Sequence, residues 1–263
     1  MWRKHWQLAR DPFPASGSPY VGASGHEEAL ARMLHVIEGD GRRVILRGVS
    51  GSGKSTLLHR LVHEGRAPAR RFARAGHVTR GAELFGALAQ ALGVGPKGGS
   101  GRESAWRSLS DAMRLCRWQK LATVLIVDDA QCLDTPEDRR DLERLDHLDT
   151  HPSARFCVVL SWSDPPDEPS NAPARDWDLS IRIPPLLRSE SVRYVGEKLA
   201  AAGRTEPAFT PFALVRLHDL SGGVPRGLDR LATLALMAGA LRKREMVTPD
   251  LVDAVASECE QAA

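Results

Sequence analysis

Residues 48–55 of this 263-residue chain read GVSGSGKS, which satisfies the pattern GxxxxGK[S/T] and decides the fold class. A short apolar segment, residues 44–46, precedes the motif, and an amphipathic segment, STLLHRLV, continues from its last residue. This order of strand, glycine-rich loop and helix is the context that a phosphate-binding loop requires. Because glycine makes up about 7% of residues, a chance match to the spacing occurs roughly once in 100 such chains. We therefore reject the alternative that the motif is a glycine-rich turn that binds no ligand.

The motif predicts a site for the phosphates of ATP. Its glycines let backbone N–H groups turn inward around phosphate oxygens, and the helix that follows adds its positive N-terminal end. We expect Lys54 to reach the β- and γ-phosphates and the Ser55 hydroxyl to bind Mg²⁺. The predicted nucleotide contacts are Gly48, Ser50, Gly51, Ser52, Gly53, Lys54, Ser55 and Thr56.

A second segment, VLIVDDAQCL at residues 124–133, lies about 75 residues beyond the loop. A buried strand rarely ends on two carboxylates unless a cation or a donor meets them. Beside a phosphate-binding loop this pattern is that of a Walker B strand. It predicts that Asp128 holds Mg²⁺, directly or through water, and that Asp129 polarises the attacking water as a catalytic acid. That either aspartate is an ordinary turn residue stays open, above all for Asp129.

The pattern of elements predicts an α/β fold with two parts. Strand and helix signals alternate up to Pro185, which favours a parallel sheet covered by helices on both faces. Beyond it the strand signals stop, and the pairs Thr210-Pro211 and Thr248-Pro249 give helix starts. We predict a nucleotide-binding core over residues 23–185 and a small all-helical domain over residues 186–263. Residues 1–22 are expected to pack near the nucleotide site.

Composition favours a cytoplasmic protein with no membrane span, because no run of 18 apolar residues and no signal-peptide core is visible. The four cysteines lack metal-ligand spacing, which predicts reduced thiols. The net charge of +3 does not force a nucleic-acid partner. Arginine supplies 30 of the 36 basic residues. It suits phosphate well, although a coding bias explains the excess equally.

Five segments along the chain resemble one family. The segments HWQLARDPF, GHEEAL, GVSGSGKSTLL, IVDDAQ and SGGVPRGLDRL occur in this order over nearly the whole chain. They are similar to the ExeA/TniB-type AAA+ ATPases, which include the general-secretion-pathway ATPase A and the transposition-helper ATPases. The resemblance implies a P-loop NTPase core with a three-layer αβα architecture, followed by a helical lid. It also implies Mg²⁺-dependent hydrolysis of ATP to ADP and phosphate, and ATP-dependent assembly into a ring or filament.

The resemblance assigns further residues. It implies that Arg226 in GGVPR is the sensor 2 arginine, which reaches the γ-phosphate from the lid. An arginine at a helix start is a poor choice for the helix dipole unless an anion lies nearby, which agrees. For sensor 1, Ser161 and Ser163 remain alternatives, because Trp162 blurs the alignment. For the arginine finger that acts on a neighbouring subunit, Arg175 is the first candidate and Arg155 the second.

Position 129 departs from the family pattern, which has Asp-Glu where this chain has Asp-Asp. The aspartate is one methylene shorter, so its carboxylate falls about 1 Å short of the place from which glutamate holds water. Such a misplacement can cost on the order of 100-fold in rate. We therefore expect slow hydrolysis.

Residues 66–80 hold five arginines and no acid. Relatives of the transposition type line a channel with basic residues that hold DNA, which makes Arg70, Arg71 and Arg74 candidates for non-specific contacts to double-stranded DNA. That these arginines are solvated side chains at a strand edge is the alternative.

Three functions follow from these observations. The first is an ATP-dependent oligomeric switch that acts on a protein partner. The second is a DNA-bound ATPase of the transposition-helper kind. The third is a P-loop kinase for a small molecule, against which the GGVPR lid argues. Secretion-type relatives carry a membrane span and a wall-binding domain after the ATPase. Because nothing follows residue 263 here, we expect a soluble helper or regulator.

Overall fold

The computed structural model describes residues 2–14, 20–39, 41–76, 82–95, 101–165, 172–173 and 176–261 of the chain. Its backbone divides into two compact units, which we treat separately. The larger unit contains residues 26–50 and 54–183. The smaller unit contains residues 1–25, 51–53 and 184–263, so the glycine-rich loop contributes to both.

The larger unit is built on a parallel five-stranded sheet with the strand order β2-β3-β4-β1-β5. Its central strands are rich in valine, isoleucine and leucine, which suits strands buried on both faces. The strands are β1 (Arg43–Val49), β2 (Arg70–Ala75), β3 (Ala122–Val127), β4 (Phe156–Asp164) and β5 (Leu179–Arg182).

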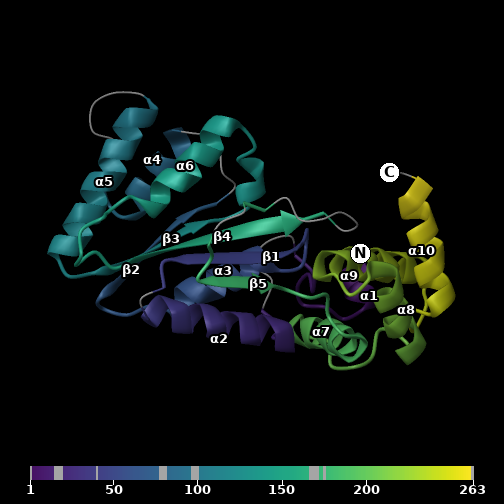
Figure 1. The fold of residues 1–263 in the computed structure, drawn as a ribbon. Coiled ribbons are helices and arrows are strands. Elements are labelled where there is room, and N and C mark those ends of the chain that lie inside the picture. The colour runs from purple at the N-terminus through teal and green to yellow at the C-terminus, as the bar shows by residue number, and fades with distance from the viewer. Residues whose placement is uncertain are drawn as a thin grey trace. The chain divides into compact units, whose positions relative to one another are not determined.

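Helices cover both faces of this sheet, as the alternating sequence signals predicted (Figure 1). One face carries α2 (Ser24–Glu38) and α3 (Lys54–Glu64), and the other carries α4 (Ala82–Ala91), α5 (Arg102–Trp118) and α6 (Pro136–Asp146). Alternate residues of one strand enter the two cores: Ile126 packs on the α2–α3 side and Leu125 on the α4–α6 side. The fold is thus the predicted three-layer αβα architecture.

Two edges of the sheet matter for function. Parallel strands end together, and here Val127 pairs with Leu160 and Val49 with Asp164. We call the carboxyl edge the region of residues 48–50, 128–129 and 161–164. We call the amino edge the region of residues 41–42, 67–70, 122–124 and 152–157, where β1 to β4 begin.

The smaller unit is helical. It contains α1 (Trp2–His5), α7 (Arg188–Ala201), α8 (Pro211–Ser221), α9 (Pro225–Leu241) and α10 (Pro249–Gln261). The predicted start at Thr210-Pro211 is confirmed, because the Thr210 hydroxyl accepts the N–H of Ala213. Trp6 is buried in the core of this unit and donates its indole N–H to the Leu236 carbonyl at 2.7 Å.

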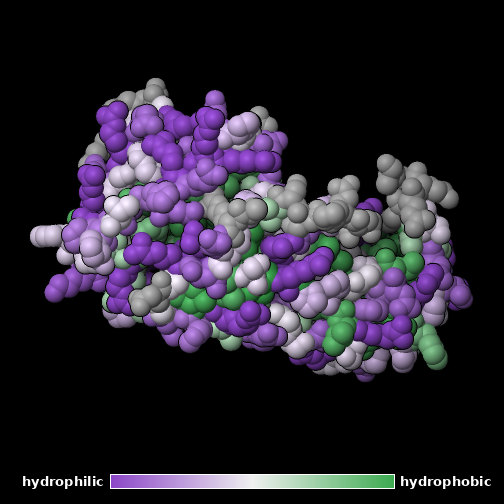
Figure 2. Space-filling model, viewed as in Figure 1, coloured by the Kyte–Doolittle hydropathy of each residue, from purple (hydrophilic) through white to green (hydrophobic). Residues whose placement is uncertain are grey.

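The surface is mainly polar. Figure 2 shows hydrophilic side chains over most of the face in view, with hydrophobic ones in small patches. Within the part of the chain that the structure describes, no helix has both the length and the apolar character needed to cross a bilayer. The single 3-10 turn named among the described elements, η1 (Ala130–Cys132), follows directly on the two aspartates.

Candidate nucleotide-binding site

The glycine-rich loop joins β1 to α3, as the motif predicted. Gly51 and Gly53 have φ angles of 82° and 96°, a region that side chains rarely adopt. Gly51 is restricted twice, since a Cβ placed there would lie 2.6 Å from the Cβ of Arg226. Glycine at this position is therefore required both by the turn and by the close approach.

Lys54, the first residue of α3, is buried, with 4% of its surface exposed. Its ammonium donates to the carbonyls of Gly48 at 2.9 Å and Val49 at 3.0 Å. A buried ammonium needs such partners, because its desolvation is costly. The loop thus holds a cation next to its own backbone.

Asp128 directly follows β3 and is 3% exposed. Its Oδ1 accepts the Ser161 hydroxyl at 2.5 Å and the N–H of Asp129 at 3.1 Å. Its Oδ2 accepts the Arg74 guanidinium at 2.6 Å. Ser55 also lies close enough to this carboxylate to help lower its pKa. The structure therefore brings together the two residues predicted to hold Mg²⁺.

These contacts keep Asp128 ionised. Burial by itself raises its pKa, but hydrogen bonds from Ser161, Arg74 and Ser55, together with the charge of Arg74, outweigh burial and lower the pKa below its usual value. The side chain is therefore a carboxylate, the form that a hard cation needs.

Asp129 adopts a left-handed backbone conformation, with φ 53° and ψ 45°. Its N–H donates to the Ser161 hydroxyl at 2.8 Å, and its carboxylate accepts the Gln131 amide at 3.2 Å. Gln131 in turn accepts the N–H of Ser163 at 3.0 Å, which ties η1 to the end of β4. Non-glycine residues in this conformation cost about 1 kcal/mol or more and cluster at functional sites.

Of the two serines proposed for sensor 1, Ser161 is fully buried and its hydroxyl lies between Asp128 and Asp129. Ser163 lies nearer the end of β4 and is half-buried. Ser161 therefore fixes the two aspartates relative to each other, a role that the sequence did not suggest. The sensor assignment stays a prediction.

The donor set fits Mg²⁺. This ion is usually bound by one or two carboxylates together with substrate phosphates, and in P-loop proteins by the serine after the lysine. Ser55 and Asp128, whose pKa Ser55 helps to lower, supply that pair. Arg74 already neutralises one oxygen of Asp128. Direct coordination through that oxygen therefore requires Arg74 to move aside.

The structure distributes the three arginines proposed for DNA over different surroundings. Arg74 pairs with Asp128, Arg70 donates to the Gly65 carbonyl at 2.8 Å, and Arg71 is exposed. Since side chains alternate along a strand, Arg70 and Arg74 share a face that Arg71 does not. Period-two alternation was the sequence signal that could have separated them. Their contact with DNA stays a prediction.

Arg226 is exposed at the second position of α9, and its N–H donates to the Gly51 carbonyl at 3.2 Å within the smaller unit. Arg175 lies outside the described residues. Arg155 is exposed at the amino edge, just before β4. Sensor 2 and finger roles for these arginines stay predictions.

Comparison with known proteins agrees with this geometry. Residues 37–165, which include the glycine-rich loop and both aspartates, match the model of an AAA domain. The chain is 27% identical over 249 residues to general secretion pathway protein A of Aeromonas hydrophila. That alignment covers 92% of this chain but 45% of the relative, so the chain spans less than half of that protein's length.

Solved structures share the fold. The Cdc6p structure from Pyrobaculum aerophilum has a TM-score of 0.72 at 20% identity, covering 95% of this chain and 71% of that one. The Orc1 protein of Aeropyrum pernix, solved in complex with DNA, has a TM-score of 0.72 at 18% identity, covering 98% and 70%. The resemblance seen in the sequence is confirmed: the chain is similar to the AAA+ P-loop ATPases of the general-secretion-pathway A type.

Proposed function

We propose that the chain binds ATP with Mg²⁺, hydrolyses it slowly, and acts in the cytoplasm as an oligomeric, nucleotide-dependent switch on a protein partner. The observation that carries the proposal is the cluster of Ser55, Asp128 and Ser161, in which Ser55 is the residue after the buried Lys54. It combines a cation for phosphate with an ionised carboxylate for the metal.

Each residue has a task in this proposal. Lys54 exchanges its carbonyl partners for the more strongly charged β- and γ-phosphate oxygens, since charge-assisted contacts are roughly twice as strong as neutral ones. Ser55 and Asp128 hold the metal site. Ser161 keeps Asp128 ionised and fixes the backbone of Asp129. A bound Mg²⁺ supplies neutralisation of the phosphate charge that develops during transfer.

Slow hydrolysis is supported by the surroundings of Asp129. Its carboxylate is the group left to orient the attacking water, and it already accepts a hydrogen bond from Gln131. The chain offers a carboxylate one methylene shorter than the family's glutamate. Both features weaken a general base, whose contribution is typically 10²- to 10⁴-fold. Slow hydrolysis suits a nucleotide-dependent switch better than a motor that must turn over ATP rapidly.

Oligomerisation is supported by the family resemblance, which implies that the finger and sensor arginines act across a subunit interface. The decisive experiment is the mass of the full chain in solution, measured with and without a non-hydrolysable ATP analogue, each in the presence and absence of duplex DNA. The proposal expects assembly with the analogue alone. A chain that stays monomeric with the analogue and still turns over ATP would overturn the oligomeric switch.

A DNA-bound helper ATPase is the second candidate, and it is favoured by the likeness in fold to an Orc1 structure that was solved with DNA. Among the arginines proposed for this role, Arg71 is exposed and Arg74 is committed to Asp128. ATPase activity that rises with duplex DNA, with binding that weakens steeply as salt increases, would select this candidate over the first.

A further inference from the structure

A cavity of about 630 Å³ lies at the amino edge of the sheet, among the residues that lead into β1, β2, β3 and β4. In open parallel sheets, ligands normally bind outside the carboxyl ends of the strands. The candidate nucleotide site lies at the carboxyl ends of the strands, as this rule expects. The cavity at the other end therefore belongs to none of the groups described so far.

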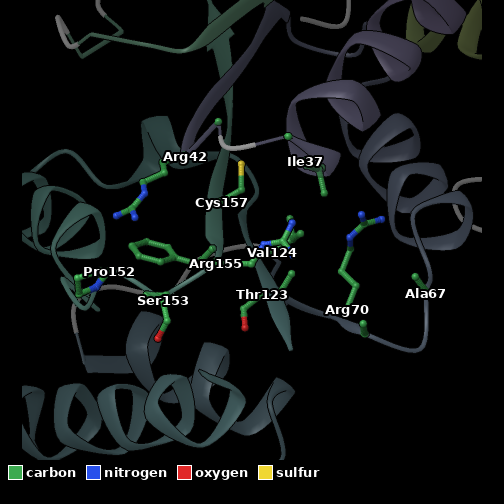
Figure 3. A pocket seen from close by; sticks show the side chains of 16 residues that line it. Ile37, Arg42, Ala67, Arg70, Thr123, Val124, Pro152, Ser153, Arg155 and Cys157 are labelled. Carbon is green, nitrogen blue, oxygen red and sulfur yellow. The ribbon is translucent and has the colours of Figure 1, made fainter. Parts of the chain in front are cut away.

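Three arginines line the cavity: Arg42, Arg70 and Arg155. Figure 3 shows Arg42 and Arg70 on opposite sides of it, with Arg155 between them. No aspartate or glutamate is among the described lining residues. The Asp178 carboxylate accepts the backbone N–H groups of residues 42 and 43 at 2.7 and 2.8 Å. Its charge is thus directed at the backbone.

Two of these arginines also make contacts within the chain that stabilise the fold. Arg70 donates one N–H to the carbonyl of Gly65, just beyond the C-terminal end of α3, where cations are favoured. Arg42 lies 5.4 Å above the ring of Phe156, a cation–π contact that leaves the N–H edge of its guanidinium available. Arg155 is exposed. Guanidinium groups stay charged at any working pH, so each of the three arginines among the described lining residues contributes a positive charge to the wall.

The rest of the wall combines small, hydroxyl and apolar residues. Ile37, Val124, Phe156 and Cys157 contribute to it, and burial raises the pKa of the Cys157 thiol to about 12, with a further contribution from Asp178. Cys157 is therefore a neutral, apolar part of the wall. Cavities of about 300 to 1,000 Å³ with apolar walls and a few charged groups are typical of sites for small organic molecules.

We propose that this cavity binds a small organic phosphomonoester, with its phosphate among the three arginines and its organic body against the apolar wall. A phosphomonoester carries a charge between about −1.5 and −2 at neutral pH. It therefore matches three fixed positive charges better than a carboxylate does. The planar fork of arginine also suits phosphate oxygens. The site is separate from the nucleotide site and does not depend on the function proposed for it.

The test uses phenyl phosphate as the probe, with benzoate and phenol as the carboxylate and uncharged comparisons, titrated calorimetrically into the full chain. Titrations are repeated with ADP and Mg²⁺ present, and in Lys54→Ala, so that binding at the glycine-rich loop is recognised. We expect one saturable phenyl phosphate site that survives both conditions, with weaker binding of benzoate and none of phenol.

Two variants locate the site. Arg42→Gln combined with Arg155→Gln changes two exposed side chains and should weaken binding on the order of tenfold or more, because hydrogen bonds to charged groups are lost. Ala69→Phe fills the cavity from an exposed position and should weaken binding with every arginine intact. The matched control, Arg139→Gln with Arg140→Gln on the exposed side of α6, should leave affinity unchanged.

Three results would overturn the proposal. They are the absence of saturable binding at millimolar phenyl phosphate, loss of binding in Lys54→Ala or with ADP, and equal weakening in the control pair. Benzoate binding as tightly as phenyl phosphate would overturn the choice of phosphate. None of these results bears on ATP binding, which is measured on the same proteins.

Discussion

Two buried hydroxyls on neighbouring strands show how differently the two edges of the sheet are built. Ser161 of β4, at the carboxyl edge, is fully buried, and its oxygen bonds both to the Asp128 carboxylate and to the N–H of Asp129. Thr123 of β3, at the amino edge, is 1% exposed, and its hydroxyl has no hydrogen-bond partner in the described part of the chain. The Ser161 hydroxyl thus makes two hydrogen bonds, whereas the Thr123 hydroxyl makes none to the described residues.

The two edges of the sheet also differ in the charged groups that they carry. At the carboxyl edge, the carboxylate of Asp128 accepts hydrogen bonds from the Arg74 guanidinium and the Ser161 hydroxyl. At the amino edge, three arginines surround a cavity whose described lining contains no acid. Preorganised partners reduce the reorganisation that a reaction demands, whereas unmatched positive charge favours binding of an anion. The contrast agrees with the two proposals, which place chemistry at the first edge and ligand binding at the second.

The largest expected effect is at the carboxyl edge. Lys54→Ala removes the ammonium that lies at the Gly48 and Val49 carbonyls, and with it two charge-assisted contacts to phosphate. At about 1.5 kcal/mol or more per contact, ATP affinity should fall on the order of 100-fold or more. Titration with a fluorescent ATP analogue measures it. Retained micromolar affinity would contradict the assignment of the loop.

The next effect concerns turnover and tests whether the Asp129 carboxylate polarises the attacking water as a general base. Asp129→Asn should lower kcat on the order of 100-fold and leave ATP bound, because a general base is lost while the binding groups remain. Asp129→Glu restores the missing methylene and should raise kcat. Steady-state phosphate release measures both variants. An unchanged rate in both would make Asp129 a structural residue.

The ion pair between Arg74 and Asp128 gives a third prediction. Arg74→Gln should lower the Mg²⁺ concentration needed for half-maximal ATPase activity, because a competing cation is removed. It should also destabilise the metal-free chain by about 1 to 2 kcal/mol, less than a fully buried pair would lose, since Arg74 is 29% exposed. Denaturant unfolding in EDTA measures the second effect.

Arg71→Gln is the matched control for Arg74, because Arg71 is an exposed arginine on the same strand. It should change neither the Mg²⁺ requirement nor stability by more than about 0.5 kcal/mol. If Arg74→Gln left the Mg²⁺ requirement unchanged, the Arg74 guanidinium would not compete with Mg²⁺ for the Asp128 carboxylate.

The sequence predicted those parts of this arrangement that are local. The loop at residues 48–55, the strand before Asp128 and the helical C-terminal region all rest on short-range patterns, and the structure agrees with each. The pairing of Arg74 with Asp128 could not be predicted in the same way, because it depends on β2 lying beside β3 in one register. The cavity likewise combines four separate strand starts. Sheet topology brings such residues together, and a single sequence does not specify it.

Ser161→Ala is the fourth prediction and tests the paired edge directly. Removing the hydroxyl leaves Asp128 and the N–H of Asp129 each without one buried partner, which should destabilise the chain by about 2 kcal/mol. Chemical denaturation measures the loss. A variant as stable as the parent would mean that the remaining donors, Arg74 and Ser55, satisfy Asp128 by themselves.

Thr123→Val is the matching change at the amino edge and should have the smallest effect, of opposite sign. Valine has nearly the same shape as threonine and favours strands. It also removes a buried hydroxyl that has no partner, so its burial cost disappears. The chain should therefore become more stable by about 1 kcal/mol under the same denaturation conditions. A loss of stability instead would mean that the Thr123 hydroxyl is satisfied in solution, and the contrast between the two edges would then rest on the arginines alone.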